Sequence, residues 1–390
     1  MTRLKWLPFA LGLAVATLTT HADELAAACG PANCKGDLVY IGTQNDGPGQ
    51  GIVAARFDPQ TGHLTAVGQV TEVARPTWLL PHPKLPVLYS VSEVGNDGHS
   101  HAAVYSFSID PGTGALKLLD KADSGGGGAT HLALDTASST LFVANYGTGQ
   151  VTSLPVLSDG SLGNPVSNDT HAGSGPSPRQ KSPHAHGVTV DPGHHYLLAP
   201  DLGDDRVYVY RLEGASHAFV PADPASEAVA PGSGPRHLVF HPNGRFAYLL
   251  TELSAEVITY RWDARHGRLT LLRKQSLTSP GYEGKKSVGE IAFSHDGRTL
   301  YVSDREQNDI VVYDVDARSG ALGEVQRIGS QGQVPWHFTL DPTGRWLLVA
   351  NQASGNVSVF KVDPGSGKLA ATSDTLAVTK PVNVVFLPRH

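Results

Sequence analysis

Apolar and polar positions along the chain follow a motif that recurs seven times. In each copy a short apolar run leads to a polar turn of the Asp-Pro-x-Gly-Arg type, and a second apolar run follows and ends in polar residues. The plainest copies are HLVFHPNGRFAYLLTE (237–252), IAFSHDGRTLYVSDR (291–305) and FTLDPTGRWLLVANQ (338–352). Short apolar runs joined by turns rich in Gly, Pro, Asn and Asp are typical of antiparallel strands. Each copy therefore predicts a β-hairpin.

Two further strands follow each hairpin. The third is clearest in RVYVYRL (206–212) and DIVVYDVD (309–316), and the fourth begins after Thr-Gly-x-Leu or a variant, as at 113–116 and 366–369. Successive turns lie 53, 56, 50, 53 and 47 residues apart, at His82, Asp135, Asp191, His241, Ser294 and Asp341. Four short strands in about 50 residues is the pattern of a β-propeller blade.

The two ends of the repeat array predict how the ring closes. The first repeat begins with its second strand, at 38–43, and the chain ends with a first strand, at 384–388. Pairing these two strands completes a seventh blade and removes two open sheet edges. We therefore predict an all-β fold, a single seven-bladed β-propeller over 38–390. The stretch 164–186, rich in Ser, Gly and Pro, is expected to be a long loop that crosses one face.

The N-terminal segment has the pattern of a secretory signal peptide. Arg3 and Lys5 precede an apolar core, and small residues stand at the −3 and −1 positions before Asp23. We expect cleavage after residue 22, a tail over 23–37, a periplasmic or secreted protein, and no membrane span in the mature chain. An uncleaved anchor is the alternative. Export would permit a bridge between Cys29 and Cys34, and the sequence leaves their redox state open.

Composition and motifs exclude several other classes of function. Charged residues make up 17% of the chain, the formal net charge is −6, and no basic stripe with interleaved aromatic residues occurs. Nucleic acid is therefore not an expected partner. No Gly-x-Ser-x-Gly elbow is present to supply a serine nucleophile. His184 and His186 could supply two metal ligands, but the spacing assures no third, so no metal and no cofactor are expected.

Candidate site residues gather where the repeat places chain entries and exits. The first and second strands of a blade are antiparallel, so the residue before the first strand lies beside the residue after the second strand. Both lie on the face opposite the hairpin turns. The earlier of two entry positions holds Thr77, Thr130, His186, Arg236, Gly289 and Trp336. The next position holds Trp78, His131, Gly187, His237, Glu290 and His337. The exits hold Glu93, Asn145, Tyr146, Asp201, Glu252, Asp304, Arg305, Asn351 and Gln352.

Residues that differ from blade to blade are better candidates than residues that recur. His131, His237 and His337 share one position, which favours a structural role in the repeat. By contrast, other repeats carry small residues at the positions of the strongest candidates, Arg236, Glu252 and Arg305. We predict these three and His186 as catalytic, and we predict contacts with the substrate from His184, Glu290, Trp336, His337 and Asp201.

In its repeats the chain resembles the lactonase family of seven-bladed propellers, which includes propeller-type 6-phosphogluconolactonase and fungal carboxy-muconate cyclase. The resemblance covers about 38–387 and is carried by SPHAHGVTVDP, GPRHLVFHPNGRFAYLLTEL and GEIAFSHDGRTLYVSDR. It implies a cluster of one histidine (His184 or His186), one glutamate and arginines, which fall on Glu252, Arg236 and Arg305. Trp336 stands where relatives commonly have arginine, and Thr251 and Asp304 stand where asparagine is usual.

The resemblance and the residues together favour hydrolysis of a small, sugar-type lactone. Water would be the nucleophile, Glu252 or His186 the general base, and Arg236 and Arg305 the groups that stabilise the oxyanion. The missing arginine and the export signal make a phosphorylated substrate less favoured. The reverse, lactonising reaction uses the same groups. An exported propeller that only binds a ligand or a protein partner at the same mouth is the alternative, and a redox propeller would need a richer histidine cluster.

Overall fold

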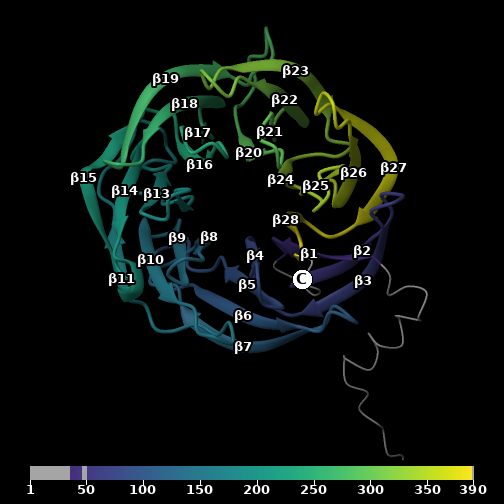
Figure 1. Cartoon of the computed structure of the whole chain (residues 1–390), viewed down its shortest axis with the longest axis horizontal. Helices are drawn as coiled ribbons and strands as arrows, with labels where there is room; N and C mark the ends of the chain where they lie inside the picture. Colours follow the sequence, from purple (N-terminus) through teal and green to yellow (C-terminus); the bar gives the residue numbers. More distant parts are fainter. Residues whose placement is uncertain (1–35, 46–50, 389–390) are drawn as a thin grey trace, which may run out of the picture.

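The structure is a computed structural model that describes residues 36–45 and 51–388. Seven four-stranded antiparallel sheets form a ring, with the first strand of each blade innermost and the fourth outermost (Figure 1). The predicted seven-bladed β-propeller is therefore confirmed. The predicted signal peptide, Cys29 and Cys34 lie outside the described residues. No helix in the described part of the chain has the length and apolar character needed to cross a membrane.

The strands follow the repeat closely. One blade joins the two ends of the chain, and six blades are continuous in sequence. The joined blade contains β28 (Pro381–Phe386), β1 (Asp37–Thr43), β2 (Ile52–Phe57) and β3 (Leu64–Thr71). The next three contain β4 (Leu79–Pro81), β5 (Val87–Ser92), β6 (Ala103–Ile109) and β7 (Leu116–Asp123); β8 (Ala129–Asp135), β9 (Thr140–Asn145), β10 (Gln150–Pro155) and β11 (Ser167–Thr170); and β12 (Thr189–Val190), β13 (Tyr196–Asp201), β14 (Arg206–Leu212) and β15 (Phe219–Ala228).

A single 3₁₀ turn, Gly214–Ser216, lies between β14 and β15 and is the one helical element among the described residues. The last three blades complete the ring. The blades contain β16 (Pro235–Phe240), β17 (Phe246–Thr251), β18 (Glu256–Asp263) and β19 (Arg268–Ser276); β20 (Val288–Phe293), β21 (Thr299–Asp304), β22 (Asp309–Val315) and β23 (Leu322–Gly329); and β24 (Pro335–Leu340), β25 (Trp346–Asn351), β26 (Asn356–Val362) and β27 (Leu369–Ala377).

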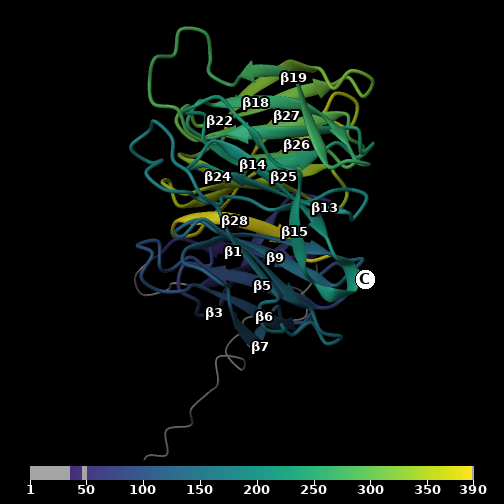
Figure 2. The same cartoon turned by 90° about the vertical axis from the view of Figure 1, so that its left-hand side faces the viewer.

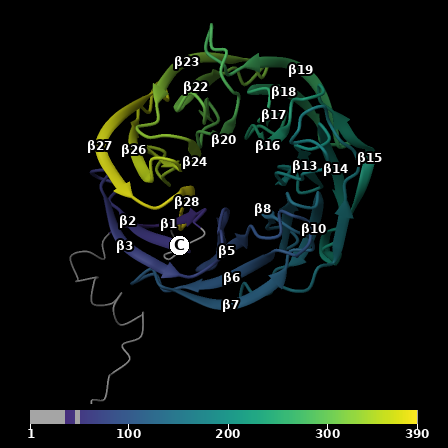
Figure 3. The same ribbon diagram turned by 180° about the vertical axis from the view of Figure 1, so that it is seen from behind.

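The predicted closure of the ring is confirmed. β28 pairs antiparallel with β1, with Val39 opposite Phe386 and Ile41 opposite Val384. Views from both faces place the C-terminal strand beside the N-terminal one (Figures 1 and 3). This pairing places β1 inside a sheet of four strands, between β28 and β2, so the N-terminal strand is not left at a sheet edge.

Apolar packing between neighbouring blades forms the core. The second strands of six blades, from β5 to β25, are buried at every position. Buried tyrosines on three of these strands also link their blade to the next, because their hydroxyls donate to a glycine carbonyl of the following blade. These are Tyr89 to Gly160 (3.0 Å), Tyr248 to Gly320 (3.1 Å) and Tyr301 to Gly367 (2.8 Å). Gly367 has a φ of 69°, and a Cβ there would lie 2.2 Å from the Thr299 hydroxyl, so this close approach requires glycine.

The strands run from one face of the ring to the other (Figure 2). Hairpin turns and chain entries therefore lie on opposite faces, as the repeat predicts. The prediction that 164–186 is irregular is wrong for Ser167–Thr170, which forms the outer strand β11 and pairs with β10. Its polar sequence lacks the alternation of a half-buried strand because it lies at the blade's outer edge, where backbone hydrogen bonds to β10 hold it.

Candidate active site

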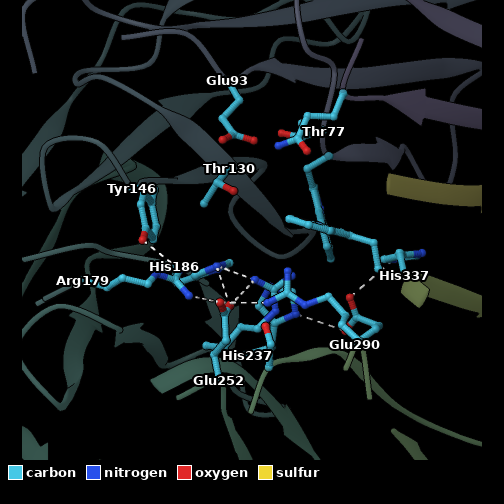
Figure 4. Close-up of a pocket in the computed structure, with 16 residues that line it drawn as sticks. Thr77, Glu93, Thr130, Tyr146, Arg179, His186, His237, Glu252, Glu290 and His337 are labelled. Carbon is cyan, nitrogen blue, oxygen red and sulfur yellow. Dashed lines mark hydrogen bonds and ion pairs between the residues drawn. The ribbon is translucent and has the colours of Figure 1, made fainter. Parts of the chain in front are cut away.

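A cavity of about 310 Å³ lies at the entry-and-exit end of the central channel, lined by sixteen residues (Figure 4). It contains seven of the nine predicted site residues. These seven are His186, Arg236, Glu252, Glu290, Arg305, Trp336 and His337. Their chemical roles stay predictions. A larger hollow of about 580 Å³ lies among hairpin turns between two blades, but its Asp296 and Arg298 are exposed and paired with each other at 2.7 Å.

β-Bulges explain how consecutive residues both reach the cavity. Successive side chains of a regular strand point to opposite faces of the sheet. The register of the innermost strand pair shifts between Pro235 and His237, and again between Pro335 and His337. The extra residue in such a bulge turns its side chain toward the same side as its neighbour. Arg236 and His237 consequently line one cavity, as do Trp336 and His337.

Glu252, which follows β17, is surrounded by three guanidinium groups. Its Oε1 lies 2.5 Å from Arg179 Nη1 and 2.8 Å from Arg305 Nη2, and its Oε2 lies 3.0 Å from Arg236 Nη1. The Glu252 side chain is 2% exposed. Burial alone would raise the pKa of this carboxyl, but Arg305, Arg236 and Arg179 outweigh burial and hold the pKa well below its usual value. Both carboxylate oxygens therefore already accept from cations.

His186 is neutral and is engaged by Arg236. Burial, and then the charge of Arg236, hold the pKa of His186 well below its usual value. Because a neutral imidazole has one acceptor nitrogen, and Arg236 Nη1 donates to His186 Nε2, the proton of this ring is on Nδ1. His186 Nε2 also lies 3.6 Å from Glu252 Oε2, and Figure 4 shows the two side chains close together.

Trp336, from the blade next to that of Arg305, packs against two of the arginines. Its ring centroid lies 4.2 Å from the guanidinium carbon of Arg305 and 5.8 Å from that of Arg236. Such contacts stabilise a desolvated cation without adding charge. Burial lowers the pKa of Arg305 to about 10, which leaves it charged at neutral pH.

Four aromatic rings pack together beside the cavity. Trp78 contacts His131 with a centroid separation of 3.9 Å, and His237 and His337 each lie edge-on to Trp78, at 5.4 and 5.3 Å. Burial lowers the pKa of all three histidines, that of His337 to about 4, so these rings are neutral at pH 7. The recurring histidines therefore supply a packed, uncharged wall.

Two predicted contacts lie elsewhere. We expected His184 and Asp201 at the mouth, but neither lines the cavity. His184 stacks on Tyr146 with centroids 4.4 Å apart. Asp201 is fully buried, accepts from the backbone N–H groups of His184 (2.7 Å) and Gly203 (2.8 Å), and lies 2.6 Å from His171 Nδ1. The polar groups of both residues bind other parts of the protein, and these contacts hold the segment before β12 in place.

Arg179 is the residue that sequence reasoning missed. It lies in the segment after β11, where Gln180 fixes the backbone by donating to Leu202 O at 2.8 Å. One Arg179 nitrogen contacts Glu252, and another donates to the Tyr146 hydroxyl at 3.1 Å. The available signal was the lone arginine of a Ser-, Gly- and Pro-rich segment that leads directly into His184 and His186. Across the described residues, no three His, Cys, Asp or Glu side chains are grouped to hold a metal ion.

Comparison with known proteins agrees with this geometry. Residues 38–386 match the protein family described as Lactonase, 7-bladed beta-propeller. A 6-phosphogluconolactonase of Bacillus subtilis (strain 168) is 33% identical over 348 residues, which cover 89% of this chain and 97% of that protein. The solved structure of the Pseudomonas aeruginosa periplasmic gluconolactonase PpgL has a TM-score of 0.85 and 38% identity, and covers 90% of this chain and 99% of its own.

A further solved structure, a putative 6-phosphogluconolactonase of Bacteroides fragilis, has a TM-score of 0.82 and 32% identity and covers 90% of this chain and 98% of its own. The fold and the site define a seven-bladed β-propeller with a carboxylate–arginine cluster at one end of its channel. The family match over nearly all of the blades is more specific. This chain belongs to the lactonase family of seven-bladed β-propellers.

Proposed function

We propose that this protein is a lactonase that opens a small, unphosphorylated sugar lactone by addition of water. The observation that carries the proposal is the cluster of three arginines around one buried glutamate in the cavity. Lactone opening develops negative charge on the carbonyl oxygen and ends with a new carboxylate. Guanidinium groups stabilise both, and they do so best in a site from which most water is excluded.

The arginines are held in place before the substrate binds. Arg236 donates from Nε to Gly289 O at 2.6 Å and from Nη1 to Glu252. Arg305 is held between Glu252 and the ring of Trp336. Donors that need not reorganise during the reaction lower its barrier most. In the proposed reaction these two groups hold the carbonyl oxygen, water attacks the carbonyl carbon, and the ring oxygen leaves. Lactone formation, the reverse reaction, would use the same contacts.

The charge of the cavity favours an unphosphorylated substrate. Three arginines line it, and three glutamates, Glu93, Glu252 and Glu290, balance them, so with neutral histidines the formal charge of the lining is zero. A phosphate dianion would need surplus cations that this lining lacks. Trp336 instead offers an aromatic face next to the arginines, which suits the C–H face of a sugar ring.

We also propose that the reaction takes place outside the cytoplasm. The N-terminal signal-peptide pattern supports export. The similar PpgL protein is described as a periplasmic gluconolactonase. Sugar phosphates are cytosolic metabolites, so an exported enzyme and an unphosphorylated lactone fit together.

Hydrolysis rates for matched lactones test the proposed function. We expect purified protein to open glucono-1,5-lactone well above the spontaneous rate. The value of kcat/KM for the 6-phosphorylated lactone should be at least about tenfold lower, because a phosphate meets no surplus cation. A higher kcat/KM for the phosphorylated compound would overturn the substrate assignment. Binding of gluconate without any lactone turnover would favour the alternative, a propeller that only binds its ligand.

A further inference from the structure

The cavity contains a second buried glutamate, Glu290, that no arginine within 36–45 or 51–388 engages. Its Oε1 accepts from the backbone N–H of Ile291 at 2.9 Å and lies 3.2 Å from His237 Nδ1, which donates to it because a carboxylate oxygen only accepts. Its Oε2 has no hydrogen-bond donor among the described residues. A buried carboxylate oxygen without a donor is costly, so this atom has capacity for a proton or for the O–H of a bound molecule.

The groups that face Glu290 do not neutralise it. His237 comes from β16, His337 from β24 and His131 from β8, and burial keeps all three uncharged. The Nδ1 atom of His337 accepts from the backbone N–H of Val384 at 3.3 Å, so its proton is on Nε2, which lies 3.6 Å from Glu290 Oε2. That separation is too long for a hydrogen bond.

The two groups predicted as general base are already occupied. Glu252 has both oxygens on arginines, and His186 Nε2 accepts from Arg236. A base must have a free electron pair within reach of the attacking water. Among the carboxylates that line this cavity, Glu93 lies 3.6 Å from Arg75 and Glu252 is fully paired. Glu290 is therefore the acidic side chain of the lining that has no arginine partner in the described structure.

Backbone contacts place Glu290 next to the proposed oxyanion donor. Arg236 Nε donates to the carbonyl of Gly289, the residue directly before Glu290, at 2.6 Å. The backbone N–H of Glu290 donates to the Ser303 hydroxyl at 2.8 Å, which fixes the start of β20. In Figure 4 Glu290 lies beside His337, and Glu252 lies nearer His186 and Arg179. A lactone carbonyl held by Arg236 would consequently have Glu290 at its side.

We propose that Glu290 is the general base of lactone opening, and that Glu252 is a positioning residue that orients the arginines. The proposal rests on the lactonase function proposed above. Glu290 Oε2 takes one proton from water while the water oxygen bonds to the carbonyl carbon, and the carbonyl π electrons become an oxyanion at Arg236 and Arg305. The carbon–ring oxygen bond then breaks, the ring oxygen takes the proton back from Glu290, and the new carboxylic acid releases its own proton to solvent.

The test compares Glu290→Gln, Glu290→Asp and a control, Glu213→Gln, in the full chain. Glu213 is exposed and pairs with Arg211 far from the cavity. With glucono-1,5-lactone, Glu290→Gln should lower kcat by about 10²-fold or more, the usual contribution of a general base. It should also remove the fall in kcat/KM at acid pH that protonation of the base produces. Glu290→Asp should keep that fall at reduced rate, and the control should match the wild-type protein.

Binding of gluconate, measured by calorimetry, separates catalysis from folding. We expect Glu290→Gln to bind gluconate within about threefold of the wild-type affinity, because the arginines that hold the carboxylate are untouched. The inference is overturned if Glu290→Gln keeps wild-type kcat and its acid limb, or if gluconate affinity falls as far as kcat does. A wild-type protein that opens no lactone would instead contradict the proposed function, so the two failures are distinguishable.

Discussion

Replacing Glu252 with glutamine should lower the free energy of unfolding by about 3–5 kcal/mol, the usual cost of removing one partner from a buried ion pair. The carboxylate is the shared counter-ion of Arg236, Arg305 and Arg179, and Arg236 and Arg305 are themselves buried. Without it these guanidinium groups repel one another with little water to screen them. Equilibrium unfolding in urea at neutral pH measures the difference.

Two further variants show whether the loss comes from the ion cluster. Glu256→Gln, four residues along the same hairpin and only partly buried, should change stability by less than about 0.5 kcal/mol. The double variant Glu252→Gln/Arg305→Met should lose less free energy of unfolding than the two single variants lose when their losses are added, because it removes one uncompensated cation. A Glu252→Gln protein that unfolds within about 1 kcal/mol of the wild type would show that the carboxylate is not the electrostatic centre of the mouth.

Replacing Arg305 with methionine should lower kcat for glucono-1,5-lactone by about 10²–10³-fold, the usual cost of removing one oxyanion donor. Methionine keeps an apolar stem against Trp336, and Glu252 retains Arg236 and Arg179, so the cluster stays compensated. The loss should therefore appear in the rate more than in stability. Steady-state kinetics with the spontaneous rate subtracted gives the value.

Arg268→Met is the matched control for this change, because Arg268 is exposed on the outer strand β19. It should retain wild-type kinetics. If Arg305→Met keeps kcat within about threefold of the wild type, Arg305 does not contact developing charge, and Arg236 would have to act alone.

The repeat predicts the fold almost completely, for a physical reason. Each blade is specified by local alternation, turn residues and a fixed period, and the unmatched strands at 38–43 and 384–388 specify closure. The outer strand Ser167–Thr170 was not predicted, because its four residues are all polar and show no apolar alternation. Backbone pairing with β10 and side-chain hydrogen bonds, such as Asn168 Nδ2 to Gly125 O at 2.6 Å, hold it instead.

The site could be predicted only in part from the sequence. Arg236, Glu252 and Arg305 could be predicted because each differs from the residues that other blades carry at the same position of the repeat. All three line the cavity. Asp201 also differs from the residues at the equivalent positions of other blades, but its carboxylate contacts His171 and the backbone N–H of His184. The spacing of residues in the sequence does not predict in which direction this side chain points. Arg179 lies outside the repeat, in a segment whose course depends on long-range contacts.

A structure of the full protein with gluconate tests the central claim most directly. The gluconate carboxylate should lie in the 310 Å³ cavity, with its oxygens about 2.7–2.9 Å from nitrogens of Arg236 and Arg305. Its carbon chain should lie between Trp336 and Glu290. Gluconate bound only among the hairpin turns near Asp296 and Arg298, with the arginine mouth unoccupied at saturating ligand, would contradict the assignment of this cavity as the active site of a lactonase.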